Sequence, residues 1–149
     1  MQWSSGLGRT ALPGLAGPAP FGNTGGVLIE RGELARTRVK VCGVTTPEAA
    51  RVAVACGADA LGLMFYPGSP RHVSFETAAG IVSELPPLVV AVGVFVDPAP
   101  ESVCAAIDRT GIGALQFHGR EAPDFCTRFG LPSIKAFRLR DRASLAPLA

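Results

Sequence analysis

Short apolar runs alternate along this chain with longer segments whose apolar residues recur at helical spacing. Runs of four to eight residues rich in Val, Leu, Ile and Phe predict strands. They cover residues 38–42, 60–65, 88–95, 114–117 and 133–137. Their starts lie 19 to 28 residues apart, which is the length of a strand, a turn, a helix and a turn. The pattern therefore predicts repeated βαβ units and a parallel sheet.

The segments between these runs carry signals for helix starts and stops. A hydroxyl cap or a proline at the first helical position marks each start, at Thr46-Pro47, Ser74, Pro100 and Pro123. After Ser74 a capping box is missing, because Thr77 stands where Glu or Gln would be. The stops fall at Gly57, Pro86-Pro87, Gly111 and Gly130.

The first 36 residues differ from the rest of the chain. Gly and Pro are frequent there and no periodicity is sustained. We expect a disordered or loosely ordered extension over residues 1–36 and a folded domain over residues 37–149. Prolines at 13, 18 and 20 interrupt the apolar centre that a secretory signal peptide needs.

Composition narrows the class of protein. Of the 149 residues, 48% are hydrophobic and 17% charged, as in soluble α/β proteins. The net charge of +2, with no run of Lys or Arg, argues against a nucleic-acid or membrane partner. No apolar stretch reaches the roughly 18 residues that cross a bilayer.

The four cysteines match neither a zinc-binding pattern nor a redox pair. Free thiols are typical of a reducing compartment, so we expect a cytoplasmic protein. Cys56, Cys104 and Cys126 fall in predicted helices, where we expect them to be small buried hydrophobes. Cys42 is different, because it ends the first predicted strand.

Polar side chains gather at the carboxyl ends of the predicted strands. One follows each strand in turn: Cys42, Arg71, Asp97, His118 and Arg138. The carboxyl ends of parallel strands share one edge, which is where barrels and open α/β sheets bind ligands. This edge is the predicted site.

Lys40 and Cys42 are two residues apart on one strand, so they share a face, while Val39 and Val41 point toward the helices. An ammonium near a thiol favours the thiolate, which can act as a base or a nucleophile. Alternatively, Cys42 fills space and Lys40 belongs to a structural ion pair.

The loop "FYPGSPRHVS" is stiffened by three Pro and Gly residues and places Arg71 at the same edge. An arginine there suits a carboxylate or phosphate, although it could equally be a solvated surface side chain. His118 is either catalytic or a hydrogen-bonded structural residue. Asp97 could simply cap the helix that follows it.

Taken together, these segments resemble the phosphoribosylanthranilate isomerase family. The resemblance rests on K-x-C-G (Lys40–Gly43), S-P-R (Ser69–Arg71), G-V-F-V (Gly93–Val96) and Q-x-H-G (Gln116–Gly119), in unbroken order over about residues 38–149. It implies an α/β fold of the TIM-barrel (β/α)8 family, here with only about five βα units and hence an incomplete barrel.

The resemblance also implies a reaction of tryptophan biosynthesis. The family converts N-(5'-phosphoribosyl)anthranilate to 1-(2-carboxyphenylamino)-1-deoxyribulose 5-phosphate by an Amadori rearrangement. Cys42 would be the base that removes the C2' proton, Arg71 would hold the anthranilate carboxylate, and His118 and Lys40 would line the substrate pocket. No metal or organic cofactor is implied, and the oligomeric state is left open.

The match predicts a chain that lacks strands 6 to 8. With them would go the family's general-acid aspartate and its phosphate-binding loops, so we expect little or no activity from this chain alone. The residues after 137 would begin a fifth helix. Two alternatives stay open: a non-catalytic half-barrel completed by a second chain, and an open doubly wound α/β binding module.

Overall fold

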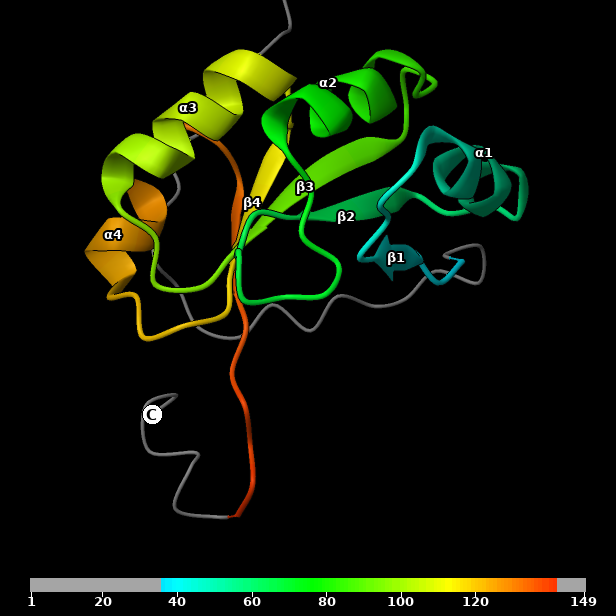
Figure 1. The fold of residues 1–149 in the computed structure, drawn as a ribbon. Coiled ribbons are helices and arrows are strands. Elements are labelled where there is room, and N and C mark those ends of the chain that lie inside the picture. Colours follow the sequence, from blue (N-terminus) through cyan, green and yellow to red (C-terminus); the bar gives the residue numbers. More distant parts are fainter. Residues whose placement is uncertain (1–35, 142–149) are drawn as a thin grey trace, which may run out of the picture. The chain divides into compact units, whose positions relative to one another are not determined.

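The computed structural model describes residues 36–141, which form a parallel five-stranded sheet with a helix after each of the first four strands (Figure 1). The strands are β1 (Lys40–Cys42), β2 (Ala60–Met64), β3 (Val90–Phe95), β4 (Ala114–Phe117) and β5 (Ser133–Lys135). The helices are α1 (Pro47–Ala55), α2 (Phe75–Ser83), α3 (Pro100–Thr110) and α4 (Pro123–Thr127). Except for residue 36, the N-terminal extension lies outside the described residues, as does most of the expected fifth helix.

The strands lie in their sequence order, β1-β2-β3-β4-β5, and every neighbouring pair is parallel. A doubly wound sheet instead reverses direction beside its first strand and places helices on both faces. The alternative of a doubly wound module is therefore wrong for residues 36–141. The sequential order, with its helices in one outer layer (Figure 1), is that of a barrel wall.

The predicted helix starts are confirmed. The Thr46 hydroxyl accepts a hydrogen bond from the Ala49 amide, and Ser74 accepts one from Thr77, both at 3.1 Å. Prolines open α3 and α4, and Gly111, whose φ of 72° suits a residue without a side chain, is the C-cap of α3. Two predicted stops fall late, because α2 ends at Ser83 and α4 at Thr127, three residues before Pro86 and Gly130.

The outermost strands are shorter than predicted. β1 begins at Lys40 rather than at residue 38, and β5 ends at Lys135 rather than at residue 137. Before β1, the Val39 amide donates to the Asp59 carboxylate at 2.8 Å instead of to a neighbouring strand. Arg36 also pairs with Asp59, and together these donors hold the pKa of Asp59 below its usual value.

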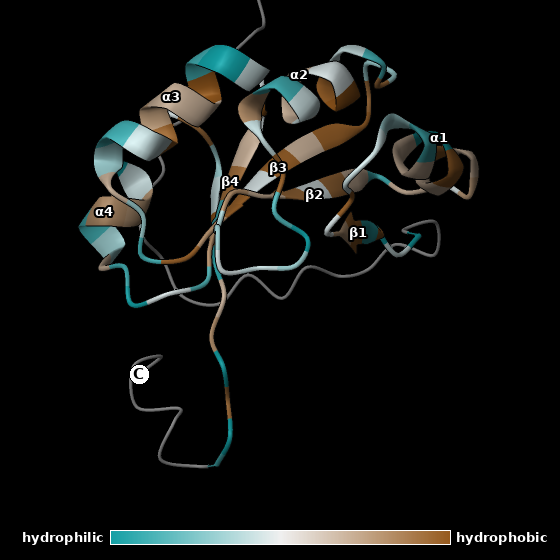
Figure 2. Cartoon of the chain, viewed as in Figure 1, coloured by the Kyte–Doolittle hydropathy of each residue, from teal (hydrophilic) through white to brown (hydrophobic). Residues whose placement is uncertain are grey.

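The core lies between the sheet and the helices. Leu61, Leu63, Leu115, Phe95 and Phe117 point into it from the strands and are at most 2% exposed. Ala78, Ile81, Val103 and Ala106 cover them from α2 and α3. Figure 2 shows that β2 and β3 are mainly hydrophobic, whereas the helices carry both hydrophobic and hydrophilic residues. Each large side chain buried here contributes roughly 1.5–3 kcal/mol.

The opposite face of the sheet carries the candidate chemistry. The register sets Lys40 beside Ala60 and Cys42 beside Gly62, while Val41 lies beside Leu61 on the helix side. This confirms the predicted division of β1 into two faces. Val41 is nevertheless 38% exposed, since β1 pairs with β2 alone within the described residues.

Two of the cysteine predictions are wrong. Cys126 is buried, but Cys56 and Cys104 are exposed. Cys56 caps the end of α1 instead of lying inside it, and Cys104 is on the outer side of α3, away from the core residues Val103 and Ala106. The exposure of Cys56 and Cys104 therefore follows from their positions on the helices and not from the usual burial of free cysteine. Among residues 36–141, no helix is long and apolar enough to cross a membrane.

Candidate active site

The end of β1 places a thiol and an ammonium over one glycine of β2. A methyl group on Gly62 would lie 2.8 Å from the Cys42 sulfur and 2.9 Å from the Lys40 nitrogen. Both polar groups therefore converge on the space that the missing side chain leaves. Cys42 is exposed and Lys40 half-buried, so the pair is open to a ligand.

Arg71 reaches the same strand end from the loop after β2. Its guanidinium Nη1 donates to the Cys42 carbonyl at 3.2 Å. Its side chain also lies against Gly43, where a methyl group would be 2.6 Å from the Arg71 Cδ and 2.8 Å from Nη1. Gly43 has a φ of 82°, so both the backbone and the approach of Arg71 favour glycine there.

The structure thus brings Arg71, from the S-P-R motif, to Lys40 and Cys42, which share the K-x-C-G motif. Within residues 36–141, the Lys40 ammonium makes no hydrogen bond or ion pair, so the alternative of a structural ion pair is not supported there. Arg71 donates to a single carbonyl, which leaves most of its guanidinium donors for another acceptor. Two cations beside an exposed thiol suit an anionic ligand.

His118 and Arg138 lie in a different hollow. It has a volume of about 620 Å³ and lies between α4 and the ends of β4 and β5. Its polar lining also includes Lys135, and Phe137 forms part of its apolar wall. His118 is exposed, and no described contact joins its side chain to Cys42, Lys40 or Arg71.

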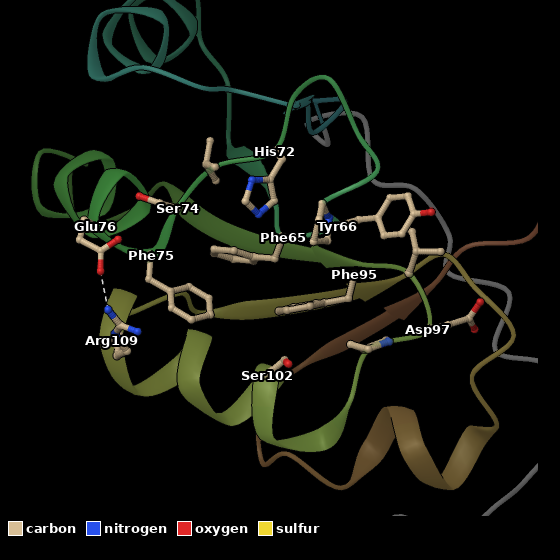
Figure 3. A pocket seen from close by; sticks show the side chains of 14 residues that line it. Phe65, Tyr66, His72, Ser74, Phe75, Glu76, Phe95, Asp97, Ser102 and Arg109 are labelled. Atoms are coloured by element: carbon tan, nitrogen blue, oxygen red, sulfur yellow. Dashed lines mark hydrogen bonds and ion pairs between the residues drawn. The ribbon is translucent and has the colours of Figure 1, made fainter.

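A further hollow, of about 530 Å³, lies beside α2 and α3 rather than over β1 (Figure 3). The rings of Phe65, Phe75 and Phe95 form its floor, with centroids 5.3–5.4 Å apart from one ring to the next. His72 points toward it in Figure 3, while Arg109 is paired with Glu76 at its edge. The hollow contains none of the predicted substrate-binding residues.

Glu121 organises the other half of this edge, and sequence reasoning did not single it out. Its carboxylate accepts hydrogen bonds from the Asp97 and Gly119 amides at 2.8–3.2 Å and from the Lys135 ammonium at 2.6 Å. The side chain is only 3% exposed. Burial alone would raise the pKa of Glu121, but the Lys135 ammonium and the backbone amides of Glu121 and Asp97 outweigh it and lower that pKa.

The expectation that Asp97 caps α3 is wrong. Ala99 is the N-cap and makes no side-chain bond, whereas the Asp97 carboxylate accepts the Arg120 amide at 2.6 Å. Asp97 has a φ of 46°, a conformation that Asp tolerates better than most residues. It ties the end of β3 to the loop after β4.

Two kinds of residue escaped the sequence reasoning. Gly43 and Gly62 carry no functional group, so nothing in a motif search marks them as site residues. Glu121 stands two residues after His118-Gly119 and directly before a helix start, where a carboxylate is expected as a simple helix-terminal charge. Only the close approach of β3, β4 and β5 reveals its role.

A sequential parallel βα wall with polar side chains at one strand end is the arrangement of the (β/α)8 barrel class, of which the described residues form a part. Comparison with known proteins narrows this further. Residues 39–148 match the family model described as N-(5'phosphoribosyl)anthranilate (PRA) isomerase. The chain belongs to this family.

Individual relatives support the assignment. The N-(5'-phosphoribosyl)anthranilate isomerase of Nitrosomonas eutropha is 51% identical over 114 residues, which cover 76% of this chain and 55% of that protein. The crystal structure of the Thermotoga maritima enzyme matches with a TM-score of 0.73 and 38% identity, over 76% of this chain and 56% of that one.

A phosphoribosyl anthranilate isomerase solved with reduced 1-(o-carboxyphenylamino)-1-deoxyribulose 5-phosphate also has a TM-score of 0.73 at 38% identity. That match covers 76% of this chain and 59% of the other. The chain spans about half the length of the curated relatives it matches.

Proposed function

We propose that this chain supplies the β1–β5 part of an isomerase site that acts on N-(5'-phosphoribosyl)anthranilate. The observation that carries the proposal is the convergence of Cys42, Lys40 and Arg71 at the carboxyl end of β1 and the loop after β2. Membership of the family and the phosphorylated product analogue bound to one relative support this choice of substrate class.

In this proposal Cys42 is the base of the Amadori rearrangement. Once the ribose ring opens, the substrate is an iminium, which makes the neighbouring C2' proton acidic. The Cys42 thiolate takes that proton, the C2'–H electron pair forms the C1'–C2' double bond, and the iminium nitrogen becomes neutral. The resulting enolamine then tautomerises to the ketone.

The two cations have separate roles in this proposal. Arg71 holds the anthranilate carboxylate by its remaining guanidinium donors, because a planar fork matches a carboxylate. Lys40 places a positive charge beside the sulfur and lines the substrate pocket. His118, which lines the separate hollow beside α4, would contact a more distant part of the same substrate. The steps break one C–O bond of the sugar ring and move protons, with no net oxidation or group transfer, so no metal or organic cofactor is proposed.

We propose that the reaction takes place in the cytoplasm. The four cysteines of the chain are free, as expected of a reducing compartment, and the substrate is a small phosphorylated metabolite. Neither nucleic acid nor membrane has a part in this proposal.

A non-catalytic half-barrel completed by a second chain is the second candidate. Within the described residues, β1 and β5 each pair on one side only. Ile134, in β5, is 47% exposed. Unpaired strand edges invite another chain. This candidate predicts a stable complex on co-expression with the second chain and aggregation of this chain alone.

The test joins this chain to the part of the Nitrosomonas eutropha relative that lies beyond the matched region and measures substrate turnover. Cys42→Ser should lower kcat by about 10²–10⁴-fold, the usual scale of a lost acid–base group. Cys104→Ser removes another exposed thiol and should leave kcat unchanged. Unchanged turnover in Cys42→Ser would remove Cys42 from the mechanism.

A further inference from the structure

We infer that Gly62 of β2 is a positioning residue, whose missing side chain holds the Cys42 thiol and the Lys40 ammonium together. This inference deepens the proposed function and rests on it, because it explains how the proposed base is kept beside a cation. It is carried by the geometry of β1 and β2 alone.

Space, rather than backbone conformation, makes glycine special at this position. Gly62 does not have a positive φ, so alanine could adopt its backbone conformation. A methyl group there, however, would lie 2.8 Å from the Cys42 sulfur, 2.9 Å from the Lys40 nitrogen and 3.2 Å from the Cys42 Cα. Carbon atoms do not approach sulfur or nitrogen this closely, so at least one group must move.

The sulfur and the ammonium are the groups that can move. The Cys42 Cα is fixed by the pairing of β1 with β2, in which Cys42 lies directly beside Gly62. The ends of the Cys42 and Lys40 side chains are partly exposed and free to rotate away. A methyl group between them would therefore separate the pair, while the 3.2 Å contact with the Cys42 Cα asks only a few tenths of an ångström of the strand.

Separation should lower the reactivity of the thiol. Cys42 is already exposed, so access does not limit its reaction with an alkylating reagent. The thiolate is the nucleophile, and a nearby ammonium raises its population. Moving Lys40 away should slow alkylation at neutral pH, whereas a thiol held merely by packing would react at an unchanged or greater rate.

The chain offers two matched control glycines. Gly80 lies in α2 with nothing within 4 Å of an added methyl group. Gly93 lies in β3 and is as buried as Gly62, but an added methyl group would meet Ile112 at 2.6 Å and Phe95 at 2.9 Å. Gly93→Ala therefore crowds a strand glycine without touching either Cys42 or Lys40.

The experiment treats the 149-residue chain with iodoacetamide at pH 7 and follows Cys42 and Cys104 in separate peptides by mass spectrometry. Gly62→Ala should slow alkylation of Cys42 at least ~3-fold relative to Cys104, because the ammonium no longer lies beside the sulfur. Gly80→Ala and Gly93→Ala should leave the ratio unchanged. Circular dichroism checks that each variant is folded.

A double-mutant cycle separates positioning from simple destabilisation. Lys40→Met should slow Cys42 alone by a similar factor, and Gly62→Ala should then add no further effect, since the pair is already broken. Additive effects, or an equal slowing in Gly93→Ala, would overturn the inference. These alkylation rates are measured without substrate. The inference can therefore fail while Cys42→Ser still abolishes turnover, and it can hold if Cys42 proves not to be the base.

Discussion

Two polar clusters lie at the same end of this sheet and differ in how they are satisfied. The first, Cys42 with Lys40 and Arg71, has one hydrogen bond between its members and rests on glycines. The second, Asp97 with Glu121 and Lys135, is joined to backbone amides and carbonyls by bonds of 2.6–3.2 Å. Polar residues at strand ends thus divide into those whose hydrogen bonds fix loops and those whose donors stay uncommitted, which the proposed function assigns to the substrate.

The difference follows from what each cluster must do. A buried carboxylate is costly unless its oxygens are bonded, and Glu121 meets that condition with protein donors alone. An ammonium or guanidinium that is to bind substrate must instead keep donors uncommitted. The comparison predicts that the Glu121 cluster carries stability and the Cys42 cluster carries almost none.

The largest effect is expected for Glu121→Ala. Removing this carboxylate leaves the Lys135 ammonium without its anion and two amides without an acceptor. The free energy of unfolding should fall by about 3 kcal/mol, near the lower end of values for broken buried pairs. Urea denaturation measures it, with Asp108→Ala on the exposed side of α3 as the control. A loss no greater than that of the control would contradict the role given to Glu121.

The next-largest effect on the free energy of unfolding is expected when the lysine of each cluster is replaced by methionine. Lys135→Met should lower the free energy of unfolding by about 2 kcal/mol, because it leaves Glu121 buried without a cation. Lys40→Met should change it by less than about 0.5 kcal/mol, as for surface changes that break no contact. Equal losses in the two variants would end the distinction between the clusters.

A smaller effect should appear at Gly43. Gly43→Ala and Gly57→Ala impose similar backbone strain, because the two glycines have φ values of 82° and 91°. Only Gly43 has Arg71 against it, whereas nothing lies within 4 Å of a methyl group on Gly57. Gly43→Ala should therefore cost about 1 kcal/mol more than Gly57→Ala, the lower end of overpacking costs. Equal costs, measured by thermal unfolding, would show that Arg71 is not held there.

The smallest effect is on pH dependence. The pKa of Glu121 is lowered in the folded state, so its contribution to stability is fully present above the unfolded value of about 4.5. That contribution is lost as pH falls through the folded pKa. Unfolding free energies of the wild type should therefore decline more between pH 5 and pH 3 than those of Glu121→Gln. Parallel curves would indicate that the carboxylate is not preferentially stabilised.

Much of the fold could be predicted from the sequence, because local signals agree with it. Alternating apolar runs, Thr46 and Ser74 as caps, and the prolines before α3 and α4 gave the order and type of the elements. The ends of β1, β2, β3 and β5 were missed by one or two residues, because an apolar run can extend beyond the residues that pair with a neighbouring strand. Exposure of Cys56 and Cys104 was missed because residue type alone does not say which side of a helix faces the core.

The candidate site could be predicted only in part. Cys42, Lys40 and Arg71 were found by their chemistry, and the βα rhythm indicated that they share one edge. Gly43 and Gly62 were not, because their contribution is an empty volume that appears once β1, β2 and the following loop are in place. Glu121 was missed because its donors come from three strand ends that are distant in the sequence.

The sequential strand order also bears on how the chain acquires its structure during synthesis. Every strand from β2 onward pairs with the one translated just before it, so each newly emerged βα unit meets a completed neighbour. Contacts between adjacent units close short loops and form quickly. Assembly can then proceed from the amino-terminal side as the ribosome advances. The thiol and the ammonium of β1 would be seated over Gly62 well before the last unit leaves the exit tunnel.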